Sequence, residues 1–305
     1  MKYTPTLKGV ATLLLLASIG AHAADTVTVA SKIDTEGNLL GNLIAQVLKS
    51  HGIAVTDKIG LGTTPIVRKA ITTGEIDIYP EYTGNAAFFF NKGDDPLWKN
   101  AAKGYEEAAK LDYAANHIVW LAPAPANNTW AVALLGTVAK ANNIHTFTDF
   151  GKWVSTGGQV KLAASAEFVN SVGALPSFEK TYGFTLKPDQ LLVLSGGDTS
   201  ATIKAAAEQT DKVNAAMVYG TDGAIEAAGL VVLDDNRHVQ PVYAPAPLIR
   251  EAVLKAHPEI AGYLKPVFAS LDLKTLQTLN GRIQVNGEPA AAVAASYLKA
   301  KGFVK

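Results

Sequence analysis

The sequence predicts an α/β fold of two lobes, because strand and helix patterns alternate along it and two kinds of segment each occur twice. Residues 26–31 (TVTVAS) alternate as a strand does, and leucines at helical spacing follow from 39 to 48. Further strands are predicted at 130–134, 161–164, 191–194, 213–219 and 230–233, with helices between them. This order favours mixed, largely parallel sheets with flanking helices.

The two repeated segments indicate the domain organisation. A helix, a turn and a strand that ends in tyrosine occur at 64–84 and again at 199–223. Ala-Pro-Ala-Pro occurs at 122–125 and at 244–247, and its prolines favour extended backbone. We interpret these repeats as similar lobes joined by two crossing segments, with lobe I at 24–126 and 241–305 and lobe II at 127–240. The alternative is chance repetition in an alanine-rich chain.

The first 23 residues have the pattern of a signal peptide. Lys2 and Lys8 flank the start of an apolar run at 10–19, and Ala21-His22-Ala23 has the small-x-small pattern of a signal-peptidase site. The run is short for a membrane span. The chain also lacks cysteine, which excludes a disulfide, a thiol nucleophile and a cysteine-based metal site. We therefore expect an exported, soluble protein.

Charge and motifs exclude several classes of function. Lys and Arg together number 27, as do Asp and Glu, and this balance argues against binding nucleic acid or a charged membrane surface. The six histidines show no metal-ligand spacing, and HExxH, GxSxG, GxGxxG and P-loop motifs are absent from the sequence. We expect no catalytic residues, no metal and no other cofactor.

Aromatic residues gather where a ligand is expected. Tyr79, Tyr82, Trp130, Tyr219 and Tyr243 fall near predicted strand ends or crossing segments. Ligands of open α/β sheets bind beyond the carboxyl ends of the strands, and clefts between lobes are favoured sites. Several aromatic faces in one cleft suit a cation that has no hydrogen-bond donors, such as a quaternary ammonium.

Several short motifs resemble those of one family. They are SKIDTE at 31–36, YPEYTG at 79–84, NNTW at 127–130 and SAEF at 165–168, together with Tyr219 and Tyr243. The chain resembles the periplasmic binding proteins of osmoprotectant ABC importers, which capture glycine betaine, choline and carnitine, and the OsmF (YehZ) branch is nearest. The resemblance spans the mature chain. It implies the two-lobed type II binding-protein fold, a periplasmic location and delivery of the ligand to a membrane permease; we expect a monomer.

The same resemblance implies roles for particular residues. Lys32 would help hold the acidic end of the ligand, and Asn85 stands where many relatives have threonine. Pro80 is expected to end its strand so that a tyrosine can turn into the cleft. An aromatic cage for the trimethylammonium head would consist of Tyr82, Trp130, Tyr219 and Tyr243.

Two departures concern the ligand's carboxylate and the cage. Relatives often carry an arginine shortly after the position of Phe168, whereas Val169, Asn170 and Ser171 follow here. Without that bidentate clamp, carboxylate recognition is expected to be weak or different. Trp130 also stands where many relatives have tyrosine.

Two other classes of function stay open. A binding protein for ordinary amino acids or polyamines would need carboxylates near the ammonium, and Asp77 and Glu81, the nearest candidates, are interpreted as structural or surface groups. An exported hydrolase could use Glu167 or Asp198, although no nucleophile–base signature accompanies them.

Overall fold

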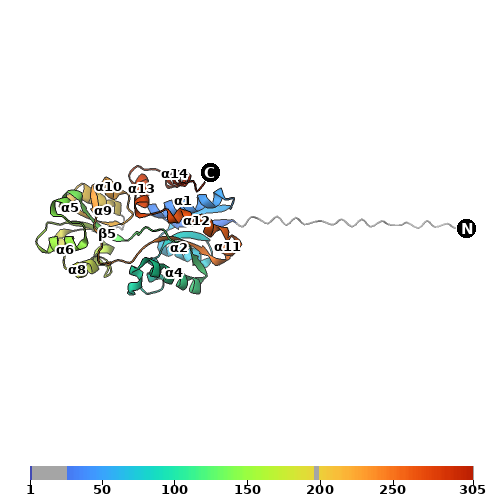
Figure 1. The fold of residues 1–305 in the computed structure, drawn as a ribbon, viewed down its shortest axis with the longest axis horizontal. Coiled ribbons are helices and arrows are strands. Elements are labelled where there is room, and N and C mark those ends of the chain that lie inside the picture. Colours follow the sequence, from blue (N-terminus) through green and yellow to red (C-terminus); the bar gives the residue numbers. More distant parts are fainter. Residues whose placement is uncertain (2–25, 196–198, 305) are drawn as a thin grey trace.

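The computed structural model describes residues 1, 26–195 and 199–304. The signal peptide predicted over residues 1–23 lies outside this part of the chain, apart from Met1. Two five-stranded sheets, each flanked by helices, form two bodies that lie end to end (Figure 1).

Both sheets follow the same plan. The first has the order β2-β1-β3-β10-β4, where β1 pairs in parallel with β2 and β3, and β10 runs antiparallel to β3 and β4. The second has the order β7-β6-β8-β5-β9, with β6 parallel to β7 and β8, and β5 antiparallel to β8 and β9. The strands are β1 (Val27–Lys32), β2 (Val55–Gly62), β3 (Ile78–Tyr82), β4 (Ile118–Trp120), β5 (Trp130–Leu135), β6 (Leu162–Ser165), β7 (Leu191–Leu194), β8 (Ala215–Tyr219), β9 (Leu230–Val232) and β10 (Pro245–Arg250). The predicted mixed, largely parallel α/β fold is confirmed.

The helices alternate with the strands until residue 250 and dominate after it, as the sequence predicts. They are α1 (Thr35–Ser50), α2 (Thr64–Thr73), α3 (Asn85–Phe89), α4 (Ala101–Asn116), α5 (Gly136–Asn142), α6 (Phe147–Ser155), α7 (Ala166–Asn170), α8 (Leu175–Tyr182), α9 (Thr199–Ala207), α10 (Ala224–Ala227), α11 (Glu251–Ala256), α12 (Glu259–Ala269), α13 (Leu273–Gln284) and α14 (Ala290–Ala300). Within the described residues, no helix has both the length and the apolar character that crossing a membrane requires.

Helix α1 organises the core around the first sheet. The Asp34 carboxylate caps it by accepting a hydrogen bond from the Gly37 main-chain N–H at 2.7 Å. Its apolar residues recur every three or four positions, so one face is hydrophobic. On that face Leu40, Leu43 and Ile44 are fully buried, and the helix packs against α12, α13 and α14.

Two crossing segments, residues 121–129 and 233–244, connect the sheets and lie side by side (Figure 1). The Asn128 N–H donates to the Tyr243 carbonyl at 2.9 Å, and the Tyr243 N–H donates to the Asn127 side-chain oxygen at 2.8 Å. Next to the first sheet, the Ala124 N–H donates to the Pro245 carbonyl at 2.8 Å. The two Ala-Pro-Ala-Pro repeats therefore meet, and the second continues into β10.

The expectation that Pro80 ends its strand is wrong. Pro80 lies inside β3, directly opposite Pro247 of β10. The Pro247 carbonyl accepts from the Leu121 N–H, so the hydrogen-bonding edge of Pro247 faces away from β3. Two prolines in such a pair remove no hydrogen bond between β3 and β10, which is why the strand continues to Tyr82.

Leu43→Ala should lower the free energy of unfolding by about 2–5 kcal/mol, because it opens a cavity beneath α1. Leu273, which is 44% exposed at the start of α13, provides the matched control. Leu273→Ala should change the same quantity by less than about 0.5 kcal/mol in urea unfolding. Equal losses in both variants would contradict the placement of α1 in the core.

Candidate functional site

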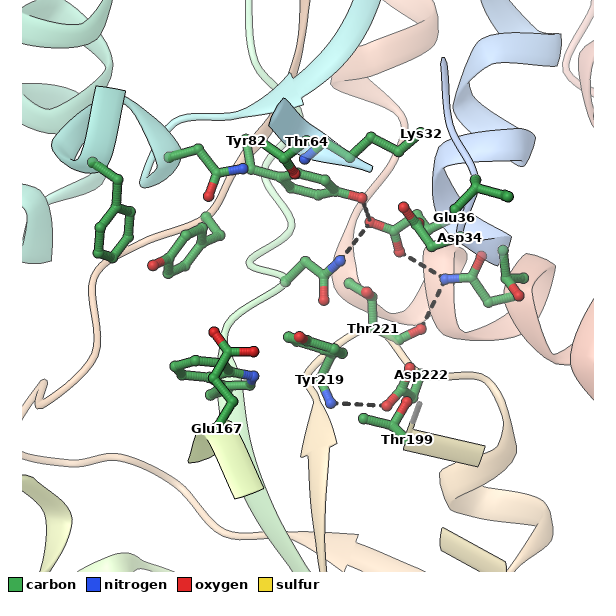
Figure 2. A pocket seen from close by; sticks show the side chains of 18 of the residues that line it. Lys32, Asp34, Glu36, Thr64, Tyr82, Glu167, Thr199, Tyr219, Thr221 and Asp222 are labelled. Carbon is green, nitrogen blue, oxygen red and sulfur yellow. Dashed lines mark hydrogen bonds between the residues drawn. The ribbon is translucent and has the colours of Figure 1, made fainter. Parts of the chain in front are cut away.

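A cavity of about 940 Å³ is lined by residues from both sheets and from the crossing segments. All six residues singled out from the sequence line it: Lys32, Tyr82, Asn85, Trp130, Tyr219 and Tyr243. Figure 2 shows Lys32 and Tyr82 on one side of the cavity and Tyr219 on the other. The fold therefore brings together the residues singled out from the sequence, although Lys32 and Tyr243 are 211 residues apart in the chain.

Trp130 and Tyr219 face the cavity from neighbouring strands. They are direct partners in the β5–β8 register, and their ring centroids lie 6.4 Å apart with planes inclined by 20°. Phe168 packs edge-on against the indole at 5.8 Å. The register of one antiparallel pair thus sets the separation of two aromatic faces.

Tyr243 reaches the cavity because Gly84 has no side chain. A Cβ atom on Gly84 would lie 2.7 Å from the Cδ1 and Cε1 atoms of the Tyr243 ring, which is closer than real contacts allow. The ring therefore rests directly on the main chain that follows β3. Burial raises the pKa of Tyr243 well above its ordinary value, so its hydroxyl stays neutral.

Tyr82 is the most buried member of the aromatic group, at 6% exposure. Its hydroxyl donates to Oε1 of Glu36 at 2.8 Å, and Nζ of Lys32 lies 4.5 Å from its ring centroid (Figure 2). Burial, followed by the charge of Glu36, raises the pKa of Tyr82 well above its ordinary value. The ring is thus neutral and contacts a cation of the protein itself.

Glu81 is a fully buried carboxylate behind the cavity wall. It forms an ion pair with Lys32 and accepts hydrogen bonds from Nδ2 of Asn85 at 2.7 Å, the Tyr79 hydroxyl at 3.0 Å and the Tyr82 N–H at 2.8 Å. Lys32, expected to hold the acidic end of a ligand, and Asn85, which stands where many relatives have threonine, therefore both contact Glu81 in this structure. Four partners also offset the cost of burying the charge.

Asp77, the other acidic residue considered beside the cage, faces away from it. It accepts from the Thr28 N–H at 2.8 Å and pairs with Arg250 at 2.8 Å. Its contacts are those of a structural group.

The cavity wall carries more carboxylates than accessible cations. Arg68 lines the cavity but forms a two-pronged pair with the buried Asp112, at 2.7 and 2.6 Å. Burial alone would lower the pKa of Arg68, and the hydrogen bonds and charge of Asp112 outweigh it and raise the pKa. The cavity's acidic lining residues are Asp34, Glu36, Glu167 and Asp222. Since Lys32 and Arg68 already have buried partners, the lining favours a ligand with a positive charge.

The sequence analysis did not assign these acidic residues to a binding site. Glu36 and Glu167 lie inside the SKIDTE and SAEF motifs, but nothing in the sequence indicated that Glu36 is buried or that Glu167, which is exposed, borders the cavity. Glu167 lines the same cavity as Tyr219 and Tyr243, and its charge adds to the larger effect of burial in raising the pKa of both tyrosines. Asp198, the other hydrolase candidate, lies outside the described residues.

Three buried polar atoms of the lining have no hydrogen-bond partner within the described part of the chain. They are Oδ1 of Asn128, Nε1 of Trp130 and Oδ1 of Asn280. Buried polar atoms are nearly always bonded. These three are therefore available to a polar ligand or to water. Among residues 26–195 and 199–304, no cluster of His, Asp or Glu has the make-up of a metal site.

The family model for the substrate-binding domain of ABC-type glycine betaine transport systems matches residues 25–300. The chain belongs to this family. The chain is 57% identical over 304 residues to the glycine betaine-binding protein YehZ of Escherichia coli, an alignment that covers 99% of this chain and all of YehZ. A glycine-betaine-binding protein of Pseudomonas aeruginosa is 31% identical over 93% of this chain and 90% of its own length. The resemblance inferred from the motifs is confirmed.

Two solved structures have the same fold as this chain. Apo YehZ of Escherichia coli superposes with a TM-score of 0.82 at 59% identity, covering 92% of this chain and all of that one. A glycine betaine/carnitine/choline ABC transporter structure, at 22% identity, shares the fold with a TM-score of 0.80. The two-lobed binding-protein fold is therefore shared with YehZ.

Asp112→Ala should lower the free energy of unfolding by about 3–5 kcal/mol, because it leaves the Arg68 guanidinium buried without its partner. The control is Glu107→Ala, which removes a surface pair with Lys92. That change should lower the free energy of unfolding by less than about 1 kcal/mol, with both variants measured by urea titration. Similar small losses in both variants would show that Arg68 does not depend on Asp112.

Proposed function

We propose that the protein is a periplasmic receptor that binds a quaternary ammonium solute, glycine betaine or a related compound, between two lobes and delivers it to an ABC permease. The named activities of the two relatives support this ligand class. The signal-peptide pattern over residues 1–23 supports the periplasm. Both relatives are binding proteins, which favours binding over turnover.

The observation that carries the proposal is the convergence of Tyr82, Trp130, Tyr219 and Tyr243 on one cavity with an acidic lining. A trimethylammonium group has no N–H donors, so it cannot pair closely with a carboxylate. It is held instead by the negative faces of aromatic rings, and nearby carboxylates add long-range attraction.

The acidic end of the ligand would be held by Lys32 and Asn85. An ammonium group has three donors and an amide two, so contact with Glu81 leaves each residue a further donor for a ligand oxygen. Glu81 already neutralises Lys32, and Val169, Asn170 and Ser171 follow Phe168 where relatives often carry an arginine. This end of the ligand should therefore contribute little to affinity.

The size of the aromatic contribution limits the affinity. A desolvated cation–π contact is worth about 0.5–2 kcal/mol, so four rings give roughly 2–8 kcal/mol. Micromolar binding needs about 8 kcal/mol before the costs of ordering and lobe closure. We therefore propose binding at micromolar affinity or weaker.

Lobe boundaries form part of the same proposal. We assign residues 24–126 and 241–305 to lobe I and residues 127–240 to lobe II, with closure by rotation about the crossing segments. The membership of the two sheets and the hydrogen bonds between residues 124–128 and 243–245 support this division.

A second candidate, a receptor for a small primary amine or an amino acid, is favoured by one observation. The sequence analysis argued against it because carboxylates were lacking beside the cage, whereas Glu36, Glu167 and Asp222 line the cavity. Carboxylates can accept hydrogen bonds from a primary ammonium. Titration with both ligand classes separates the candidates.

Isothermal titration of residues 24–305 should show saturable binding of glycine betaine, choline or carnitine, and little heat with an ordinary amino acid. Trp130→Ala should weaken binding of the quaternary amine about three- to thirtyfold, the value of one cation–π contact. Tyr113→Ala, which changes an exposed tyrosine outside the cavity, should bind as wild type does. Heat with the amino acid alone would favour the second candidate instead.

Gly84→Ala should weaken the same binding by about tenfold, because the new methyl group would displace the Tyr243 ring from the cavity wall. Gly173→Ala provides the control, since a Cβ there would meet no atom within 4 Å. Calorimetry on both variants compares the affinities. Unchanged affinity in Gly84→Ala would show that the position of Tyr243 does not matter to the ligand.

A further inference from the structure

Glu36 is a buried carboxylate whose role the aromatic cage does not by itself explain. It lies in the first turn of α1, lines the cavity and is 5% exposed. The amino terminus of a helix favours a negative charge, but a buried carboxylate still needs hydrogen-bond partners to be tolerated. Its partners therefore indicate what it does.

Three donors from three different parts of the fold meet at this carboxylate. Oε1 accepts from the Tyr82 hydroxyl at 2.8 Å and from Nδ2 of Asn128 at 3.1 Å, and Oε2 accepts from Nδ2 of Asn280 at 2.7 Å (Figure 2). These donors come from β3, a crossing segment and α13. Asn280 also donates to the Thr221 carbonyl at 2.9 Å, in the turn that follows β8. Glu36 thus connects a ring of the cage to both lobes.

Tyr82 is fixed at both ends by carboxylates. Its main-chain N–H donates to Glu81 and its hydroxyl to Glu36. A ring attracts a cation through its face, so its orientation decides whether the contact forms. A ring that is already held in place loses less rotational freedom when the ligand binds, and that raises affinity.

Proton placement agrees with this geometry. Burial raises the pKa of Tyr82 well above its ordinary value. It also raises the pKa of Glu36 above its ordinary value, against the opposing effect of its polar neighbours Thr221, Tyr82 and Asn280. The charge of Asp34 adds to the second effect. The phenol therefore keeps its proton and is the donor.

We propose that Glu36 is a positioning residue of the ligand site, which holds the Tyr82 ring in the orientation that receives the quaternary ammonium and acts on affinity through the Tyr82 hydroxyl. This inference rests on the proposed function. It gives the glutamate of the SKIDTE motif a role that does not require contact with the ligand.

A double-mutant cycle tests the inference. Glycine betaine is titrated calorimetrically into wild type, Glu36→Gln, Tyr82→Phe and the double variant, and the unfolding midpoint of each is measured. Glu36→Gln keeps the size of the side chain but turns one of its two acceptor oxygens into a donor. Each single change should weaken binding about tenfold, as the loss of a hydrogen bond to a charged group does. The double variant should bind within about twofold of Tyr82→Phe, because the two changes break one interaction.

The control is Glu179→Gln, a carboxylate of lobe II that accepts from the Leu186 N–H outside the cavity and should not affect binding. Losses that multiply in the double variant would overturn the inference, since Glu36 would then act independently of the hydroxyl. Wild-type affinity in Tyr82→Phe would overturn it even if Glu36→Gln did not fold. A wild-type protein that binds no quaternary amine would instead overturn the proposed function, and this inference with it.

Discussion

The pairing of the two crossing segments is the constraint on which the arrangement of the site depends. Hydrogen bonds that join Tyr243 to Asn127 and Asn128 hold the segments together at the centre of the molecule. Each segment joins a strand of one sheet to a strand of the other. The carboxyl ends of β3 and β8, at Tyr82 and Tyr219, therefore line the same cavity. Trp130 is the first residue of β5 after one segment, and Tyr243 lies in the other. The aromatic cluster therefore follows from how the two bodies are joined.

Charge is arranged in two layers around this space. Carboxylates behind the wall, at Glu81 and Asp112, neutralise the cations Lys32 and Arg68 that reach the cavity. Carboxylates in the wall itself then remain in excess. The cavity thus holds two basic residues without becoming positive, which suits a solute that carries its positive charge on a methylated nitrogen.

Much of the fold could be predicted from local pattern, and the failures have physical causes. Strand β7 has the predicted bounds, and most other predicted strands differ by one or two residues, because most are short apolar runs. Strands β2, β4 and β10 were not predicted; in β10 the prolines suggest polyproline backbone until a partner strand is known. The aromatic residues of the cavity were identified because they stand near strand ends and crossing segments, which the sequence pattern predicts. Glu36 and Asp222 were missed because burial of a carboxylate depends on partners distant in the chain, such as Asn280.

The position of β10 between β3 and β4 determines when the first sheet can form during synthesis of the chain. Strand β4 pairs with β10 and with no other strand in the described residues, so it has no place in the first sheet until residues 245–250 have been synthesised. The second sheet, by contrast, draws all its strands from residues 130–232 and can be completed earlier. Long-range pairing of this kind slows folding. The first sheet therefore stays incomplete until most of the chain has been made.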